Sequence, residues 1–165
     1  MQPERAYIGI GSNLGDPVSQ VRRAFQELSA LPSCRCVAQS PLYRTAPVGG
    51  PPGQPNYINA VAALDATLAP DELLAELQAL EEAQGRVRTE RLGPRTLDLD
   101  LLLYDQVICD DPRLTLPHPR LHERAFVLFP LHDIAPTLTI PGRGSLVELL
   151  ARCPLQAITR LDSAD

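Results

Sequence analysis

Lysine is absent from this sequence, and all 15 basic residues are arginine. A codon preference of the genome explains that replacement without any functional cause. The absence still excludes two kinds of phosphate site, because a P-loop needs a lysine at the nucleotide phosphates and a protein kinase needs one on a strand. Any phosphoryl chemistry in this chain must therefore rely on arginine and metal ions.

Long hydrophobic runs are also missing. No apolar segment approaches the roughly 20 residues that span a bilayer, and Met1–Arg5 has no apolar signal region. The four cysteines form no C-x-x-C pair, which argues against zinc or redox roles and favours reduced thiols. We therefore expect a cytoplasmic protein without a membrane partner.

An excess of positive charge is lacking too. The formal net charge of −5 argues against a general nucleic-acid binder, which would have to neutralise many phosphates. The chain has 165 residues, of which 44% are hydrophobic, as in an ordinary globular domain with its own core. We expect residues 1–165 to form a single domain.

The most informative stretch runs from Gly93 to Tyr104 and reads GPRTLDLDLLLY. Apolar and acidic residues alternate from Leu97 to Asp100, which predicts a β-strand. Asp98 and Asp100 then point to the same face, with Cα atoms roughly 6.6–7 Å apart. The apolar run that follows predicts that this strand, Leu97–Tyr104, is central and covered on both faces.

Two interpretations of this carboxylate pair compete. The pair is either a solvated strand end or a binding site for Mg²⁺, which needs only one or two carboxylates plus substrate phosphates. Four arginines in the eleven residues before Leu97 favour the second, because a polyphosphate would bridge the cations and the metal. They are Arg86, Arg88, Arg91 and Arg95.

The remaining patterns predict an α+β fold. Asp16-Pro17 is a good helix start, and Gly85 a good helix end. The glycine-rich turn at residues 9–15 misses the dinucleotide-binding spacing by one residue, so we do not expect a Rossmann-type site. The order of elements is that of a ferredoxin-like βαββαβ core with a mostly antiparallel sheet. The expected elements are strands 5–11, 34–43, 56–66 and 97–104, helices 17–31 and 70–85, a short strand 106–109, partly helical 120–132, a helix 145–152 and a strand 155–161.

Six short motifs together resemble those of the 6-hydroxymethyl-7,8-dihydropterin pyrophosphokinase family of folate biosynthesis. They occur in the family's order and cover most of the chain. Besides the stretch at Gly93, they are YIGIGSNLG at 7–15, YRTAP at 43–47, QPNYIN at 54–59, QGRVR at 84–88 and LPHPRLHERAF at 116–126.

The resemblance implies transfer of pyrophosphate from ATP to the pterin hydroxymethyl group, with release of AMP. It implies two Mg²⁺ ions, and helices on both faces of the sheet. The implied catalytic residues are Arg86, Arg95, Asp98 and Asp100, of which the two aspartates are also the metal ligands. The implied ATP-binding residues are Gln78, Glu81, Arg88, Arg91, His118 and Arg124. The implied pterin-binding residues are Thr45, Ala46, Pro47, Val48, Tyr57, Asn59 and Phe126.

The residues alone leave alternatives open. Tyr57 and Asn59 also fit an exposed half-sheet, and His118 fits a structural role. A Mg²⁺-dependent nucleotidyltransferase and a ferredoxin-like RNA-binding module are rival functions. From the resemblance, we expect a monomer whose partners are ATP and the pterin, without nucleic acid. Leu92 stands where some family members carry tryptophan, and Pro119 where an aromatic residue is common.

Overall fold

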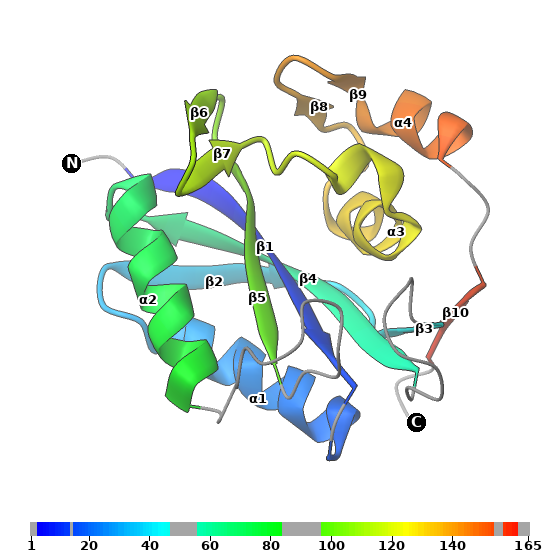
Figure 1. Ribbon diagram of the computed structural model, residues 1–165, viewed down its shortest axis with the longest axis horizontal. Coiled ribbons are helices and arrows are strands. Elements are labelled where there is room, and N and C mark those ends of the chain that lie inside the picture. The colour runs from blue at the N-terminus through cyan, green and yellow to red at the C-terminus, as the bar shows by residue number, and fades with distance from the viewer. Residues whose placement is uncertain (1–2, 14, 47–55, 84–96, 154–156, 162–165) are drawn as a thin grey trace.

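A six-stranded antiparallel sheet forms the framework of the chain (Figure 1). The computed structural model describes residues 3–13, 15–46, 56–83, 97–153 and 157–161. The strand order is β10-β3-β4-β1-β5, with β2 also paired to β4. The strands are β1 (Glu4–Ser12), β2 (Cys34–Gln39), β3 (Tyr43–Thr45), β4 (Tyr57–Ala66), β5 (Asp98–Tyr104) and β10 (Ile158–Arg160). The predicted α+β class with an antiparallel sheet is confirmed.

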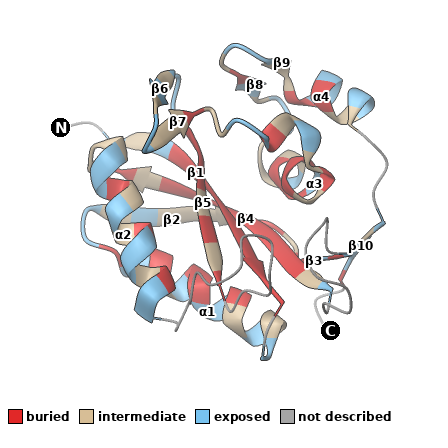
Figure 2. Ribbon diagram, viewed as in Figure 1, coloured by how far each residue is buried: buried red, intermediate tan, exposed pale blue. Residues whose placement is uncertain are grey.

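Two hydrophobic clusters lie on opposite faces of this sheet. Figure 2 shows the buried residues of the strands and helices in red. Helices α1 (Pro17–Ser29) and α2 (Pro70–Ala83) contribute to the first cluster, and α3 (Ala125–Ile134) and α4 (Leu146–Arg152) to the second. Fully buried leucines such as Leu28, Leu64 and Leu128 each contribute about 1.5–3 kcal/mol to stability. Successive side chains of β1 and β4 therefore point alternately to the first and the second cluster.

The start of α1 follows the local rule that predicted it. The Asp16 side chain accepts hydrogen bonds from the Ser19 amide and hydroxyl, and Pro17 occupies the first helical turn. The helix ends at Ser29, two residues before the predicted end. Helix α2 begins at Pro70 as predicted, whereas its predicted end at Gly85 lies outside the described residues.

Three strand predictions need correction. The predicted strand 34–43 is two strands, because Pro41 interrupts it and the Ser40 hydroxyl accepts a hydrogen bond from the Val61 amide. Strand β3 therefore includes Arg44 and Thr45, which lie beyond the end of the predicted strand. The strand predicted as central, β5, pairs only with β1 among the described strands and lies at the sheet edge.

The segment after β5 adds small elements. A short strand was expected at 106–109, but the structure has a separate hairpin of β6 (Cys109–Asp111) and β7 (Leu114–Leu116). The partly helical segment is confirmed as a 3₁₀ turn, η1 (Leu121–Glu123), followed by α3. A second hairpin of β8 (Thr139–Ile140) and β9 (Gly144–Ser145) precedes α4. No helix in the described ranges is long and apolar enough to span a membrane.

Candidate active site

The two strand-end aspartates lie on one face of β5, as predicted. Leu99 and Leu101 are buried in the first cluster, so Asp98 and Asp100 point to the opposite face, where both are partly exposed. Their partners on β1 are glycines, since Gly11 pairs with Asp98 and Gly9 with Asp100. On the neighbouring strand β1, therefore, no side chain projects beside either carboxylate.

Glu81 fixes the backbone between these two aspartates. Its carboxylate accepts a hydrogen bond from the Leu99 amide at 2.8 Å, and the residue is only 3% exposed. Because β5 is an edge strand, this N–H has no strand partner in the described sheet, and the helix supplies the acceptor. Sequence reasoning named Glu81 as a nucleotide contact and missed this role. The spacing Leu73, Leu77, Glu81 carried the signal, since it places Glu81 on the buried stripe of α2.

His118 and Arg124 approach the carboxylates from the segment that follows β7. The His118 amide donates to the Leu102 carbonyl at 2.9 Å, which docks this turn on β5. Burial lowers the pKa of His118, and the nearby charge of Asp100 opposes that change. Burial likewise lowers the pKa of Arg124, and both Asp100 and Asp98 oppose it. The charge of Asp100 thus acts on both of these predicted ATP-binding residues, and the charge of Asp98 acts on Arg124.

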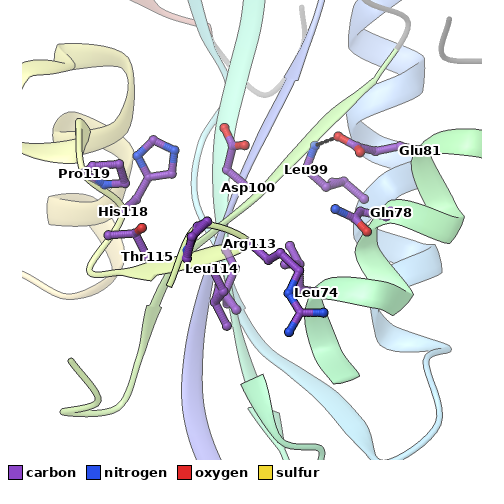
Figure 3. Close-up of a pocket in the computed structure, with 12 residues that line it drawn as sticks. Leu74, Gln78, Glu81, Leu99, Asp100, Arg113, Leu114, Thr115, His118 and Pro119 are labelled. Atoms are coloured by element: carbon purple, nitrogen blue, oxygen red, sulfur yellow. Dashed lines mark hydrogen bonds between the residues drawn. The ribbon is translucent and has the colours of Figure 1, made fainter. Parts of the chain in front are cut away.

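A cleft of about 320 Å³ runs along this edge of the sheet (Figure 3). The Asp100 side chain projects between His118 on one wall and α2 on the other. Gln78, a predicted ATP-binding residue, lies on the α2 wall. The β6–β7 hairpin supplies lining residues that sequence reasoning did not single out, because an arginine at a hairpin turn has no distinguishing local pattern. They are Arg113, Leu114 and Thr115.

A second cavity extends this cleft. It measures about 690 Å³ and lies between α2 and the β6–β7 hairpin. The two cavities share four lining residues, so a continuous groove leads from Asp100 towards the start of α2. The shared residues are Leu74, Gln78, Arg113 and Leu114.

Three of the predicted pterin residues make side-chain contacts with other predicted site residues. The Asn59 amide nitrogen donates to the Thr45 hydroxyl at 2.7 Å, and both residues are buried. The Arg124 guanidinium lies 5.5 Å from the centre of the Phe126 ring, a cation–π distance. The latter contact joins a predicted triphosphate residue to a predicted wall of the pterin pocket. Tyr57 is half-buried on β4, and Ala46 is exposed.

Six predicted site residues lie outside the described part of the chain. They are Pro47, Val48, Arg86, Arg88, Arg91 and Arg95.

The donor set suits magnesium. Asp98 and Asp100 offer hard oxygen ligands on one face of β5, and Asp100 lines the cleft. Mg²⁺ binds through one or two carboxylates together with phosphates and water. Within the described ranges, no group of three or more His, Cys, Asp or Glu residues is placed to hold a metal ion. The remaining coordination positions would then belong to substrate and solvent.

An α+β domain in which a partly buried histidine and arginine lie near a carboxylate pair beside a cleft has the features of a metal-assisted phosphoryl-transfer enzyme. A family model described as 7,8-dihydro-6-hydroxymethylpterin-pyrophosphokinase (HPPK) matches residues 7–136, and the chain belongs to this family.

Similar proteins agree with this assignment. The 2-amino-4-hydroxy-6-hydroxymethyldihydropteridine pyrophosphokinase of Pseudomonas aeruginosa is 52% identical over 161 residues, which are 98% of this chain and 99% of that protein. The protein of the same name from Haemophilus influenzae is 47% identical over 145 residues, which are 88% and 90% of the two chains.

The fold also has a solved counterpart. A crystal structure titled HPPK-DHPS in complex with substrates superposes with a TM-score of 0.72 at 10% identity. The match covers 92% of this chain but only 43% of that one. At this identity the likeness shows the fold alone.

Proposed function

We propose that this chain transfers pyrophosphate from ATP to 6-hydroxymethyl-7,8-dihydropterin, giving AMP and the pterin diphosphate in folate biosynthesis. The family match over residues 7–136 carries this proposal. The carboxylate pair of β5, whose charges act on His118 and Arg124, supports it. Neither rival function is favoured, because the relatives reported above are named as pyrophosphokinases.

The reaction is a displacement at the β-phosphorus of ATP. The pterin hydroxymethyl oxygen forms the new bond, the bond to the oxygen between the α- and β-phosphorus atoms breaks, and AMP leaves with that electron pair. The hydroxyl proton is released. Such a transfer depends on positioning and charge rather than on covalent participation by the protein.

Asp98 and Asp100 are the residues that would hold Mg²⁺, and we propose two ions. Bound magnesium neutralises phosphate charge and lowers the pKa of a hydroxyl group that it contacts. His118 and Arg124 meet the triphosphate from the opposite wall of the cleft. The resemblance gives Arg86 and Arg95 catalytic roles, and Arg88, Arg91, Gln78 and Glu81 nucleotide contacts.

The pterin lies beside the carboxylate pair. Tyr57 and Phe126 offer aromatic faces for a flat ring, and Asn59 offers an amide that matches its polar edge. The resemblance adds Thr45, Ala46, Pro47 and Val48 to the pocket. Because Arg124 stacks on Phe126, the pterin wall and the triphosphate site are in contact.

The finer description of the fold is also part of the proposal. The strand order with β1 between β4 and β5, together with helices on both faces, supports a ferredoxin-like core in three layers. A single domain over residues 1–165, a monomeric state and a cytoplasmic location remain predictions of the sequence.

Chromatography of the nucleotides formed from ATP, Mg²⁺ and the hydroxymethyl pterin tests the function. AMP should appear in equal amount to the consumed ATP, and only when pterin is present. Formation of ADP would point to an ordinary kinase. An adenylated pterin would point to a nucleotidyltransferase.

A further inference from the structure

Gly11 lies between the proposed pterin and metal residues. On β1 it pairs with Asn59 of β4 on one side and with Asp98 of β5 on the other. Neighbouring strands are about 4.8 Å apart, so the Asn59 and Asp98 Cα atoms are separated by about 10 Å. No side chain projects from β1 between them.

A side chain at Gly11 would collide with the Asn59 amide. A Cβ built there would lie 2.9 Å from the Asn59 Oδ1 atom and 3.8 Å from a ring carbon of Tyr57. The first distance is shorter than real carbon–oxygen contacts, whereas the second is ordinary packing. Gly11 does not appear among the described glycines with positive φ, so space rather than backbone conformation requires glycine.

The Asn59 amide is held where the collision would occur. Its nitrogen donates to the Thr45 hydroxyl at 2.7 Å, and Asn59 and Thr45 are 6% and 2% exposed. A shift of Oδ1 away from a new methyl group must therefore stretch or break this buried hydrogen bond. The bond also sets the orientation of the amide, which leaves Oδ1 as the acceptor above the backbone of Gly11.

We infer that Gly11 is a positioning residue for the pterin, acting through Asn59. This inference rests on the proposed function. The missing Cβ lets the amide keep its bond to Thr45 while Oδ1 accepts a hydrogen bond from a ring N–H of the substrate. The site then selects a heterocycle that presents an N–H donor to the Asn59 Oδ1 atom.

The first test is Gly11→Ala, measured by titrating the hydroxymethyl pterin in the presence of a non-hydrolysable ATP analogue. The pterin Kd should rise by about ten-fold, the usual effect of one impaired buried hydrogen bond. The Kd of the ATP analogue alone should change by less than about two-fold. Equal weakening of both ligands, or an unchanged pterin Kd, would overturn the inference.

Gly9→Ala is the matched control. Gly9 lies two residues earlier on the same face of β1, and the three nearest heavy atoms to its added Cβ all belong to Leu102, at 3.4–3.6 Å. This variant makes the same change in strand propensity without touching Asn59. It should bind the pterin within about two-fold of the unmodified protein. A ten-fold loss in this variant would show that any methyl group on β1 disturbs binding, and would overturn the inference.

A double-mutant cycle shows whether Gly11 acts through Asn59. In an Asn59→Ala background, Gly11→Ala should weaken pterin binding by less than about two-fold, because the amide is already gone. Full additivity of the two losses would contradict the inference. Turnover of the pterin by the unmodified protein in the same preparation tests the proposed function separately.

Thr45→Val keeps the inference testable if Gly11→Ala does not fold, as judged by its thermal unfolding. This variant keeps the side-chain volume but removes the hydroxyl that holds the Asn59 amide. It should also weaken pterin binding by about ten-fold and leave the ATP analogue unaffected. Unchanged pterin binding by this variant would overturn the orienting role of the Thr45–Asn59 bond, and the inference with it.

Discussion

At the scale of single residues, the metal proposal depends on Asp98 and Asp100. Both are partly exposed and Asp100 lines the cleft, so replacing either removes a carboxylate without opening a cavity in the core. Asp98→Ala and Asp100→Ala should each lower turnover by more than about 100-fold at saturating Mg²⁺. Circular dichroism and thermal unfolding should show an unchanged fold.

Asp110→Ala is the control for these two variants, because Asp110 is an exposed acidic residue on the nearby β6 strand. It should retain turnover within about two-fold. Near-normal activity of either β5 variant would contradict the metal role.

Tyr43 provides a prediction about stability and pH. Its hydroxyl donates to the Asp133 carboxylate of α3, and burial together with that carboxylate raises the pKa of Tyr43. In the unfolded chain tyrosine ionises near pH 10, whereas the folded residue stays neutral. The folded state therefore binds more protons, and its stability is lost as the pH rises above about 10.

Urea unfolding at about pH 8 and about pH 10.5 measures this effect. Tyr43→Phe should cost about 1–2 kcal/mol at the lower pH, because it leaves the Asp133 carboxylate without this donor. The variant should then lose less stability than the unmodified protein between the two pH values. An identical loss in both proteins would show that Tyr43 does not contribute to the pH dependence.

At the scale of elements, the contact between α2 and β5 determines where the carboxylates point. Glu81→Ala should reduce the unfolding free energy by about 1–3 kcal/mol, because the buried Leu99 amide loses its acceptor. Turnover should fall more than the affinity for ATP, since the strand that holds both aspartates is loosened. Faster hydrogen exchange at the Leu99 amide would report the same loosening directly.

Two further variants sharpen this test. Glu81→Gln keeps an oxygen acceptor and should recover most of the lost stability. Glu82→Ala changes the exposed neighbour and should have little effect on stability or exchange. If Glu81→Ala leaves exchange at Leu99 unchanged, Glu81 does not position β5.

Local patterns predicted those elements whose signals are local. The Asp16-Pro17 start placed α1, and the alternation at Leu97–Asp100 placed both aspartates on one face. The pairing of strands could not be predicted from local patterns in the same way. A run of leucines covered on both faces resembles a central strand, yet β5 is an edge strand whose outer side is covered by α2. The Glu81–Leu99 bond and the Gly11 contacts likewise depend on pairing between distant segments.

At the scale of the whole molecule, the two proposed substrate sites share the segment from Arg124 to Phe126. The Arg124 guanidinium, proposed to meet the triphosphate, lies over the Phe126 ring, proposed to border the pterin. ATP should therefore tighten pterin binding, and by linkage the pterin must tighten ATP binding by the same factor. Couplings of this kind are typically about 5–150-fold.

Calorimetric titration of each ligand, with and without the other, measures this factor. A non-hydrolysable ATP analogue keeps the complex intact. In Phe126→Leu, the factor by which each ligand tightens binding of the other should fall towards one. This change is separate from the direct effect of the substitution on pterin affinity. A coupling factor that is unchanged in Phe126→Leu would show that the Arg124–Phe126 contact does not transmit it.

In the proposed reaction, pyrophosphate moves as a unit to the pterin. The most direct measurement is ³¹P NMR of the reaction of ATP, Mg²⁺ and 6-hydroxymethyl-7,8-dihydropterin, followed in time with the unmodified protein and with Asp98→Ala. We predict that the three ATP signals are replaced by one AMP signal and the two coupled signals of a pterin diphosphate, and that Asp98→Ala leaves ATP intact over the same period. Signals of ADP, or of free pyrophosphate beside an adenylated pterin, would contradict the account.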